Sequence, residues 1–244
     1  MIGSIAINAD GALLCSGTGG IVWVDPATGR RGTLLDSIDG APVSGINDMV
    51  ADGKGGLYFG TVDHQRMFRG EDFFGRSALY HLNAAGHFLR LRDGLKFSNG
   101  MGLSPDDRHL YINDSSAGTY AYEILPDGSL ANGRLVSVRS DCDGLAVDCE
   151  GGIWIAQIGA GMITRILPGG EVEREIPLAA GRVTSLCFGG ADGRDMYVTT
   201  AADDAGAAVV KQAIPKLRTA ALYHARTDIP GLAHRRTNFR LAAG

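Results

Sequence analysis

Three polar residues recur at one position of a repeated sequence pattern. Asn47, Asn99 and Asp143 each stand at the start of an apolar segment, and Gly3 and Thr184 hold the same position in two further copies. Two amides and a carboxylate offer hard oxygen donors that suit Ca²⁺, Mg²⁺ or Mn²⁺ and also hold Zn²⁺ or Fe²⁺. Each could instead be a simple turn residue, because Asn-Gly and Asp-Gly are common in turns. Turn residues alone would scatter across the repeat, so the shared position favours a metal site.

The repeat itself has a regular order of elements. A polar or small pair precedes an alternating apolar strand, a turn rich in Asp and Gly, and a second apolar strand that starts 10 to 12 residues after the pair. A third strand follows in all five copies, and a fourth in the first four. The second strands begin at residues 13, 57, 110, 153 and 196. Four short strands with a period near 43 residues are typical of β-propeller blades.

The glycine content supports this interpretation. Gly accounts for 36 of 244 residues, and many glycines in an apolar chain indicate many tight turns. Four dipeptides at the predicted turns tolerate positive φ. They are Asp10-Gly11, Asp52-Gly53, Asp127-Gly128 and Gly169-Gly170. We therefore predict an all-β propeller that spans residues 1–244 as a single domain, with repeat units starting near residues 3, 47, 99, 143 and 184. The first strand of each blade lines the central channel, so the five equivalent residues should form a ring.

Charge and composition exclude several classes of partner. The net charge is −4 without a basic patch, which argues against nucleic acid. Apolar runs are shorter than the ~18 residues of a membrane-spanning helix, and the first residues do not read as a secretory signal. The four cysteines form no CxxC pair, and they indicate reduced, mostly buried thiols in a cytoplasmic protein. They are Cys15, Cys142, Cys149 and Cys187.

Four segments resemble one known family. SGINDMVADGKGGLYFGTVD, SNGMGLSPDDRHLYINDS, CDGLAVDCEGGIWIAQ and VTSLCFGGADGRDMYVTTA are similar, in this order, to the gluconolactonase, senescence-marker-protein and luciferin-regenerating-enzyme family. The resemblance runs from about residue 3 to about residue 231. It implies a six-bladed propeller with one divalent cation in the channel and hydrolysis of sugar lactones or related cyclic esters. It also implies that Asn47, Asn99 and Asp143 are metal ligands.

The chain departs from the family in two respects. The family's metal-binding Glu near its N-terminus has no counterpart here, and five repeat units stand where the family has six. Either an upstream blade is missing from this chain, or the protein is a five-unit variant whose C-terminal tail, LAHRRTNFRLAAG, closes the ring. With three protein donors, we expect this chain to bind a metal more weakly than a family member that has the Glu. Open blade faces would invite association, so we also expect a homo-oligomer.

Substrate recognition depends on two further features. Some lactonases of the family carry an Arg two residues before the first ligand, where this chain has Gly45, so specificity for sugar lactones is in question. An insertion at residues 63–76 lengthens the second unit. In one interpretation it overhangs the channel and brings His64, Arg69 and Phe73, with Arg66, Phe74 and Arg76, to the substrate. In the other it is a solvated loop whose aromatic rings pack on the blade below.

The function that follows is a metal-dependent hydrolase of a lactone. The cation would activate water, and Asp143 would be both a ligand and the general base. Asp48 and Thr184 would orient the ligands. The alternatives are a propeller that binds a small molecule without turnover, and a degenerate copy. No phosphate loop or GxSxG motif competes, and His81 and His87 are expected at the surface.

Overall fold

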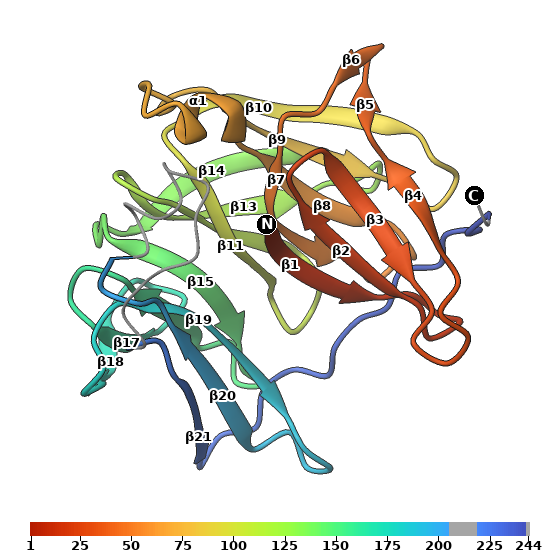
Figure 1. Cartoon of the computed structure of the whole chain (residues 1–244). Helices are drawn as coiled ribbons and strands as arrows, with labels where there is room; N and C mark the ends of the chain where they lie inside the picture. Colours follow the sequence, from red (N-terminus) through yellow and green to blue (C-terminus); the bar gives the residue numbers. More distant parts are fainter. Residues whose placement is uncertain (205–218, 243–244) are drawn as a thin grey trace.

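The structure, a computed structural model, describes residues 1–204 and 219–242. Its described part is built from antiparallel sheets that follow one another along the chain as five blades of a β-propeller (Figure 1). This arrangement confirms the predicted fold class. Among these residues the first four blades have four strands each and the last has three, as the repeat predicts.

The strands of the first two blades are β1 (Ile2–Ile7), β2 (Leu13–Gly17), β3 (Gly20–Val24), β4 (Arg31–Leu35), β7 (Ile46–Ala51), β8 (Leu57–Thr61), β9 (Ser77–Leu82) and β10 (Phe88–Leu95). The third and fourth blades contain β11 (Ser98–Leu103), β12 (His109–Asp114), β13 (Gly118–Ile124), β14 (Leu130–Ser137), β15 (Cys142–Val147), β16 (Ile153–Gln157), β17 (Met162–Ile166) and β18 (Val172–Pro177). The last blade contains β19 (Val183–Gly189), β20 (Asp195–Thr200) and β21 (Leu222–Arg226). A small hairpin, β5 (Ser37–Ile38) and β6 (Ala41–Pro42), and one helix, α1 (His64–Phe68), lie outside the blades.

The predicted turns adopt the backbone conformation that glycine favours. The φ angles are +91° at Gly11, +75° at Gly53, +86° at Gly128 and +99° at Gly170. A residue with a Cβ atom is strained in this region, so glycine allows each turn to join its two strands tightly.

Apolar residues between neighbouring blades hold the propeller together. One buried cluster joins the second and third blades through Leu79 and Leu103, and another joins the fourth and fifth through Trp154 and Phe188. The inner strands pack in sequence order, β1 against β7, β7 against β11, β11 against β15 and β15 against β19. In the described part of the chain, β1 and β19 are not among the strand pairs that pack closely.

The C-terminal tail connects the last blade to the first. After β21 it crosses below the fourth, third and second blades and reaches the first (Figure 1). The Leu232 N–H donates to the Val147 carbonyl at 3.2 Å, and the Thr237 N–H donates to the Ile7 carbonyl at 3.1 Å. Phe239 is buried in the core of the first two blades. Since Val147 and Ile7 end their inner strands, the tail lies at the opposite end from the predicted ring residues.

The cysteine prediction is partly wrong. All four thiols are free and Cys142 is buried, but Cys15 is half-buried and both Cys149 and Cys187 are exposed. Cys149 lies in a turn after β15, and Cys187 points from the outer face of the last blade. Within the described ranges, no helix has the length and apolar character needed to cross a membrane.

Candidate functional site

Every inner strand has an irregular pairing near its first residues. The register shifts between Ile2 and Ile5, Ile46 and Asp48, Ser98 and Met101, Cys142 and Leu145, and Val183 and Ser185. The five residues predicted to be equivalent all fall inside these irregular stretches. They are Gly3, Asn47, Asn99, Asp143 and Thr184. β-Bulges redirect side chains and are common beside active sites. The structure thus places the five residues at the same end of consecutive inner strands.

Glycines allow the bulged strands to approach one another. A Cβ atom on Gly3 would lie 2.0 Å from the Asn47 carbonyl oxygen, and one on Gly100 would lie 2.3 Å from the Leu145 nitrogen. Both distances are far below van der Waals contact, so these positions exclude any side chain. The close approach draws the first residues of neighbouring inner strands together.

The two asparagines are oriented through their amide nitrogens. Asn47 Nδ2 donates to the Ser98 carbonyl at 3.0 Å, and Asn99 Nδ2 donates to Ser115 Oγ at 3.1 Å. Asn99 also hydrogen-bonds the Asp143 carboxyl group. With the nitrogens anchored in this way, the Oδ1 atoms are the ends of the two side chains that could meet a cation.

Two carboxyl groups at this end of the inner strands have raised pKa values. Burial raises the pKa of Asp143 to about 7, and the nearby charge of Asp48 contributes, against a hydrogen bond from Asn99. Burial raises the pKa of Asp48 to about 6, although its carboxyl group accepts hydrogen bonds from Ser4 and from the Met49 N–H. Two desolvated carboxylates that repel each other are stabilised by a cation between them.

The third blade supports the Asp143 bulge from behind. Asn113 is buried on β12, and its Nδ2 donates to the Asp143 carbonyl at 2.7 Å and to the Gly144 carbonyl at 3.3 Å. Its Oδ1 accepts a hydrogen bond from Thr119 at 2.6 Å. Asn113 is not among the predicted site residues, because all of those in the blades come from first strands. The signal available was a polar Asn inside the apolar second strand HLYIND.

Thr184 occupies the ring position but is engaged within its own blade. Its Oγ1 donates to the Thr199 carbonyl at 3.1 Å and lies 2.9 Å from Thr199 Oγ1. Thr184 therefore lies at the predicted position of its inner strand, and its hydroxyl group is hydrogen-bonded to β20.

The insertion places His64 beside Gly45. His64 opens α1 and is buried, with Nδ1 3.2 Å from Thr18 Oγ1. A Cβ atom on Gly45 would lie 2.2 Å from His64 Nδ1, so the imidazole fills the space that a side chain at residue 45 would need. Burial lowers the pKa of His64 to about 4, which leaves the ring neutral at pH 7.

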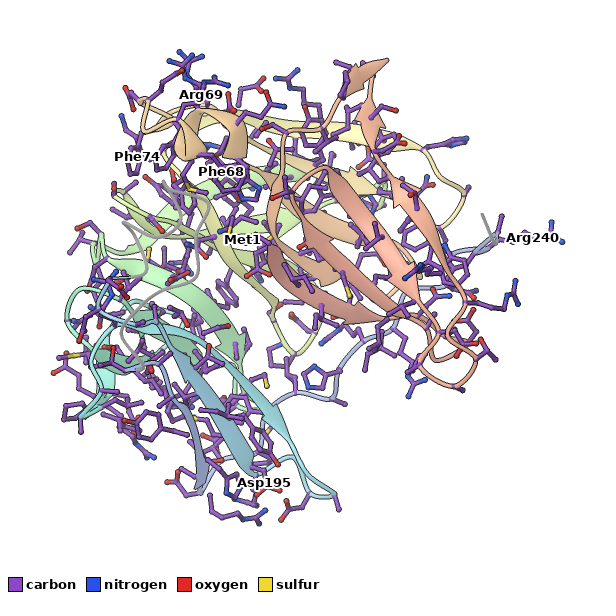
Figure 2. The ribbon with its side chains drawn as sticks, in the orientation of Figure 1. Met1, Phe68, Arg69, Phe74, Asp195 and Arg240 are labelled. Atoms are coloured by element: carbon purple, nitrogen blue, oxygen red, sulfur yellow. The ribbon has the colours of Figure 1, made fainter. Side chains whose placement is uncertain are left out.

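The other two loop candidates differ in their surroundings. Arg69 points away from the blades and pairs with Glu71, with Nε and Oε1 2.5 Å apart (Figure 2). Phe73 stacks on Phe74, with ring centroids 4.7 Å apart, and meets Phe97 edge-on at 5.7 Å. Thus Phe73 packs toward the start of β11, whereas Arg69 lies at the surface.

The donor set fits a hard divalent cation. The described residues contain no group of three or more His, Cys, Asp and Glu that could hold a metal. The ring instead offers two amide oxygens and the Asp143 carboxylate, with Asp48 nearby. Ca²⁺, Mg²⁺ and Mn²⁺ accept such oxygen ligands, whereas Zn²⁺ sites usually contain nitrogen or sulfur.

His81 is not at the surface, contrary to the prediction. It is buried on β9, stacks on Tyr58 and has Nε2 2.8 Å from Asp52 Oδ2. In the fourth blade, Arg165 contacts Asp148 in the corresponding way at 2.7 Å. The repeated arrangement identifies the His81 contact as a blade-stabilising pair, which the sequence hides because the two partners are 29 residues apart.

The fold and site define a β-propeller with hard oxygen donors where its inner strands begin. Residues 1–202 match the family described as SMP-30/Gluconolactonase/LRE-like region, and the chain belongs to this family, which confirms the predicted resemblance. Zebrafish regucalcin (Danio rerio) is 32% identical over 80% of this chain and 66% of its own length. The pentonolactonase XacC of Haloferax volcanii is 29% identical over 84% and 68%. The chain therefore spans about two thirds of the length of these relatives.

One further relative is named as a lactonase, and one solved structure shares the fold of this chain. The 6-deoxy-6-sulfogluconolactonase of Pseudomonas putida is 27% identical over 95% of this chain and 79% of its own length. The solved regucalcin from Agrobacterium tumefaciens has a TM-score of 0.76 and 22% identity, and covers 99% of this chain and 80% of that chain. At this identity the likeness shows the fold alone.

Proposed function

We propose that this protein is a lactonase that opens a lactone with the help of one divalent cation. The observation that carries the proposal is the alignment of the five strand irregularities, which gathers Asn47, Asn99 and Asp143 at one end of the inner strands. The lactonase names among the relatives support the reaction class. The metal ligands would be Asn47, Asn99 and Asp143.

The chemistry divides between the cation and the protein. A bound divalent cation supplies Lewis acidity, which polarises a carbonyl group and makes water more acidic. Asn47 and Asn99 present oxygen atoms without adding charge, because amides are neutral. Hydrogen bonds from their nitrogens to Ser98 and Ser115 orient the two side chains. Asp143 would accept the proton of the attacking water, because it is the one carboxylate among the three proposed ligands. Asp48 adds a second negative charge beside it.

The first test removes the charge of Asp143. We expect Asp143→Asn to weaken cation binding and to lower lactone hydrolysis by at least ~100-fold, because the ligand charge and the base are both lost. Calorimetric titration of metal-free protein with Ca²⁺, Mn²⁺ and Zn²⁺ measures the first effect, and a pH-indicator assay on a series of lactones measures the second.

The matched control is Asp127→Asn, which changes an exposed turn carboxylate of the third blade. This variant should bind the cation and hydrolyse lactones as the wild type does. Full hydrolysis by Asp143→Asn would refute the assignment of Asp143.

A second candidate function is small-molecule binding without turnover. It is favoured by Gly45 and the neutral His64, which replace the Arg that some lactonases use. Stabilisation of the protein by a lactone that is never hydrolysed would support this alternative.

A further inference from the structure

We propose that the entrance to this site selects lactones with an apolar alkyl or aryl substituent rather than polyhydroxylated sugar lactones. The inference rests on the proposed lactonase activity and names its substrate class. It follows from the residues that surround the ring, which we call the rim.

The rim consists of the residues two positions before each ring residue. They are Met1, Gly45, Phe97, Asp141 and Arg182. Gly45 has no side chain, and the Asp141 carboxylate accepts hydrogen bonds from Gln157 Nε2 at 2.8 Å and the Ala160 N–H at 2.7 Å. Arg182 is the basic side chain among these five residues, and it belongs to the last blade, two blades from Phe97. The side formed by the second and third blades therefore presents glycine and an aromatic ring.

His64 fills the second-blade side of the rim with an uncharged ring, because burial lowers its pKa and the amino group of Met1 lies near enough to help. His64 occupies the space beside Gly45, bonds Thr18 and stacks on Phe68 with ring centroids 5.7 Å apart. The Nε2 atom of the ring is buried and has no hydrogen-bond partner among the described residues. A neutral, buried imidazole offers a sugar hydroxyl much less than a guanidinium group would.

Three aromatic rings form an apolar patch on this side, which we call the aromatic lip. Phe73, Phe74 and Phe97 lie within 4.7 to 6.2 Å of one another, centroid to centroid. Phe74 is 46% exposed, although it sits in a cluster of rings. An exposed aromatic cluster beside a site is typical of a surface that binds apolar groups.

Two of the loop's three arginines are already paired with a carboxylate. Arg66 and Arg69 both pair with Glu71, and Arg76 also acts on the Glu71 carboxylate. Arg69 points outward, whereas Phe68 lies on the inner side of α1 (Figure 2). A hydroxyl-rich lactone would lose water where it lies against the three rings of the lip, whereas an alkyl chain would bury apolar surface there.

The test compares lactones with the same six-membered ring. We expect kcat/KM for δ-decalactone to exceed that for D-glucono-1,5-lactone by roughly tenfold or more, with δ-valerolactone in between. Phe74→Ser should lower kcat/KM for δ-decalactone about fivefold or more through KM, and should leave δ-valerolactone unchanged. The control Val138→Ser removes an exposed apolar side chain from the third blade's edge and should change neither.

The outcomes separate the two proposals. A preference for gluconolactone, or an equal effect of Phe74→Ser on all three substrates, overturns the aromatic lip and leaves the lactonase proposal standing. Absence of hydrolysis of every lactone by protein that binds a cation overturns the lactonase proposal, and the lip with it.

Discussion

At the scale of single residues, the site depends on two carboxyl groups whose pKa values are not influenced by any Lys, Arg or His of the described residues. Asp143 and Asp48 lie close enough for the charge of one to raise the pKa of the other. Their neighbours are the neutral Asn99 and Ser4. Such a pair is unfavourable when ionised in the metal-free protein and favourable once a cation binds. Proton binding and metal binding therefore compete at this site.

This competition predicts a pH dependence. In metal-free protein the folded state raises the pKa of Asp143 to about 7, so the unfolded chain ionises first as the pH rises. The free energy of unfolding that this group contributes is fully present below its unfolded pKa near 4 and is lost by about pH 7. Relative to Asp143→Asn, wild-type stability should fall by about 1 kcal/mol per pH unit between pH 5 and 7.

Urea unfolding of both proteins with a chelator present measures this difference. Saturating Ca²⁺ should reverse the trend, because the cation binds the ionised carboxylate. A stability difference that does not change with pH would show that Asp143 is not desolvated in the folded protein.

At the scale of elements, the bulges and the C-terminal tail act at opposite ends of the inner strands. The bulges bring polar residues together at one end, and the tail links the blades at the other end. Asn8 anchors the tail: its Oδ1 accepts from Thr237 Oγ1 at 2.8 Å and the Phe239 N–H at 2.9 Å, and its Nδ2 donates to the Phe239 carbonyl at 3.1 Å. Asn8 is fully buried, so these bonds are shielded from water.

Asn8→Ala should release the tail. The substitution leaves buried polar groups of Thr237 and Phe239 without partners, and we expect a loss of roughly 2–3 kcal/mol in unfolding free energy. Trypsin should also cut faster at Arg235 and Arg236, because the tail would open more often. The exposed Asn238→Ala is the control and should stay within about 0.5 kcal/mol of wild type. Unchanged proteolysis of Asn8→Ala would mean that Phe239 alone holds the tail.

At the scale of the whole molecule, the first and last blades each have an uncovered face that carries exposed apolar residues. Ile2 and Ile5 on β1 are 65% and 56% exposed, and Leu222 on β21 is 70% exposed. Tyr197 and Cys187 share the outer face of the last sheet with Leu222. Contiguous exposed apolar residues favour association.

We therefore expect the protein to self-associate through these faces. Light scattering should give a mass that rises above 25.6 kDa with concentration. The double variant Ile2→Ser, Leu222→Ser should shift the equilibrium toward the monomer, whereas Leu135→Ser, which alters an exposed residue of the third blade, should not. A wild-type mass that stays at the monomer value across the concentration range would contradict the prediction.

The blades, the turns and the five equivalent positions could be predicted from the residues alone. These depend on local properties: strand alternation has a period of two, turns need glycine at positive φ, and a repeat places equivalent residues at equivalent points. Asn47, Asn99 and Asp143 could be selected because each opens its repeat unit. The partners that these residues and their neighbours contact depend instead on how the chain folds in three dimensions. His64 beside Gly45, Asn113 behind Asp143, His81 against Asp52 and the tail against Asn8 all join segments that lie apart in the chain. Such contacts leave no periodic trace, because they are set by how the blades pack and not by the order of residues within a blade.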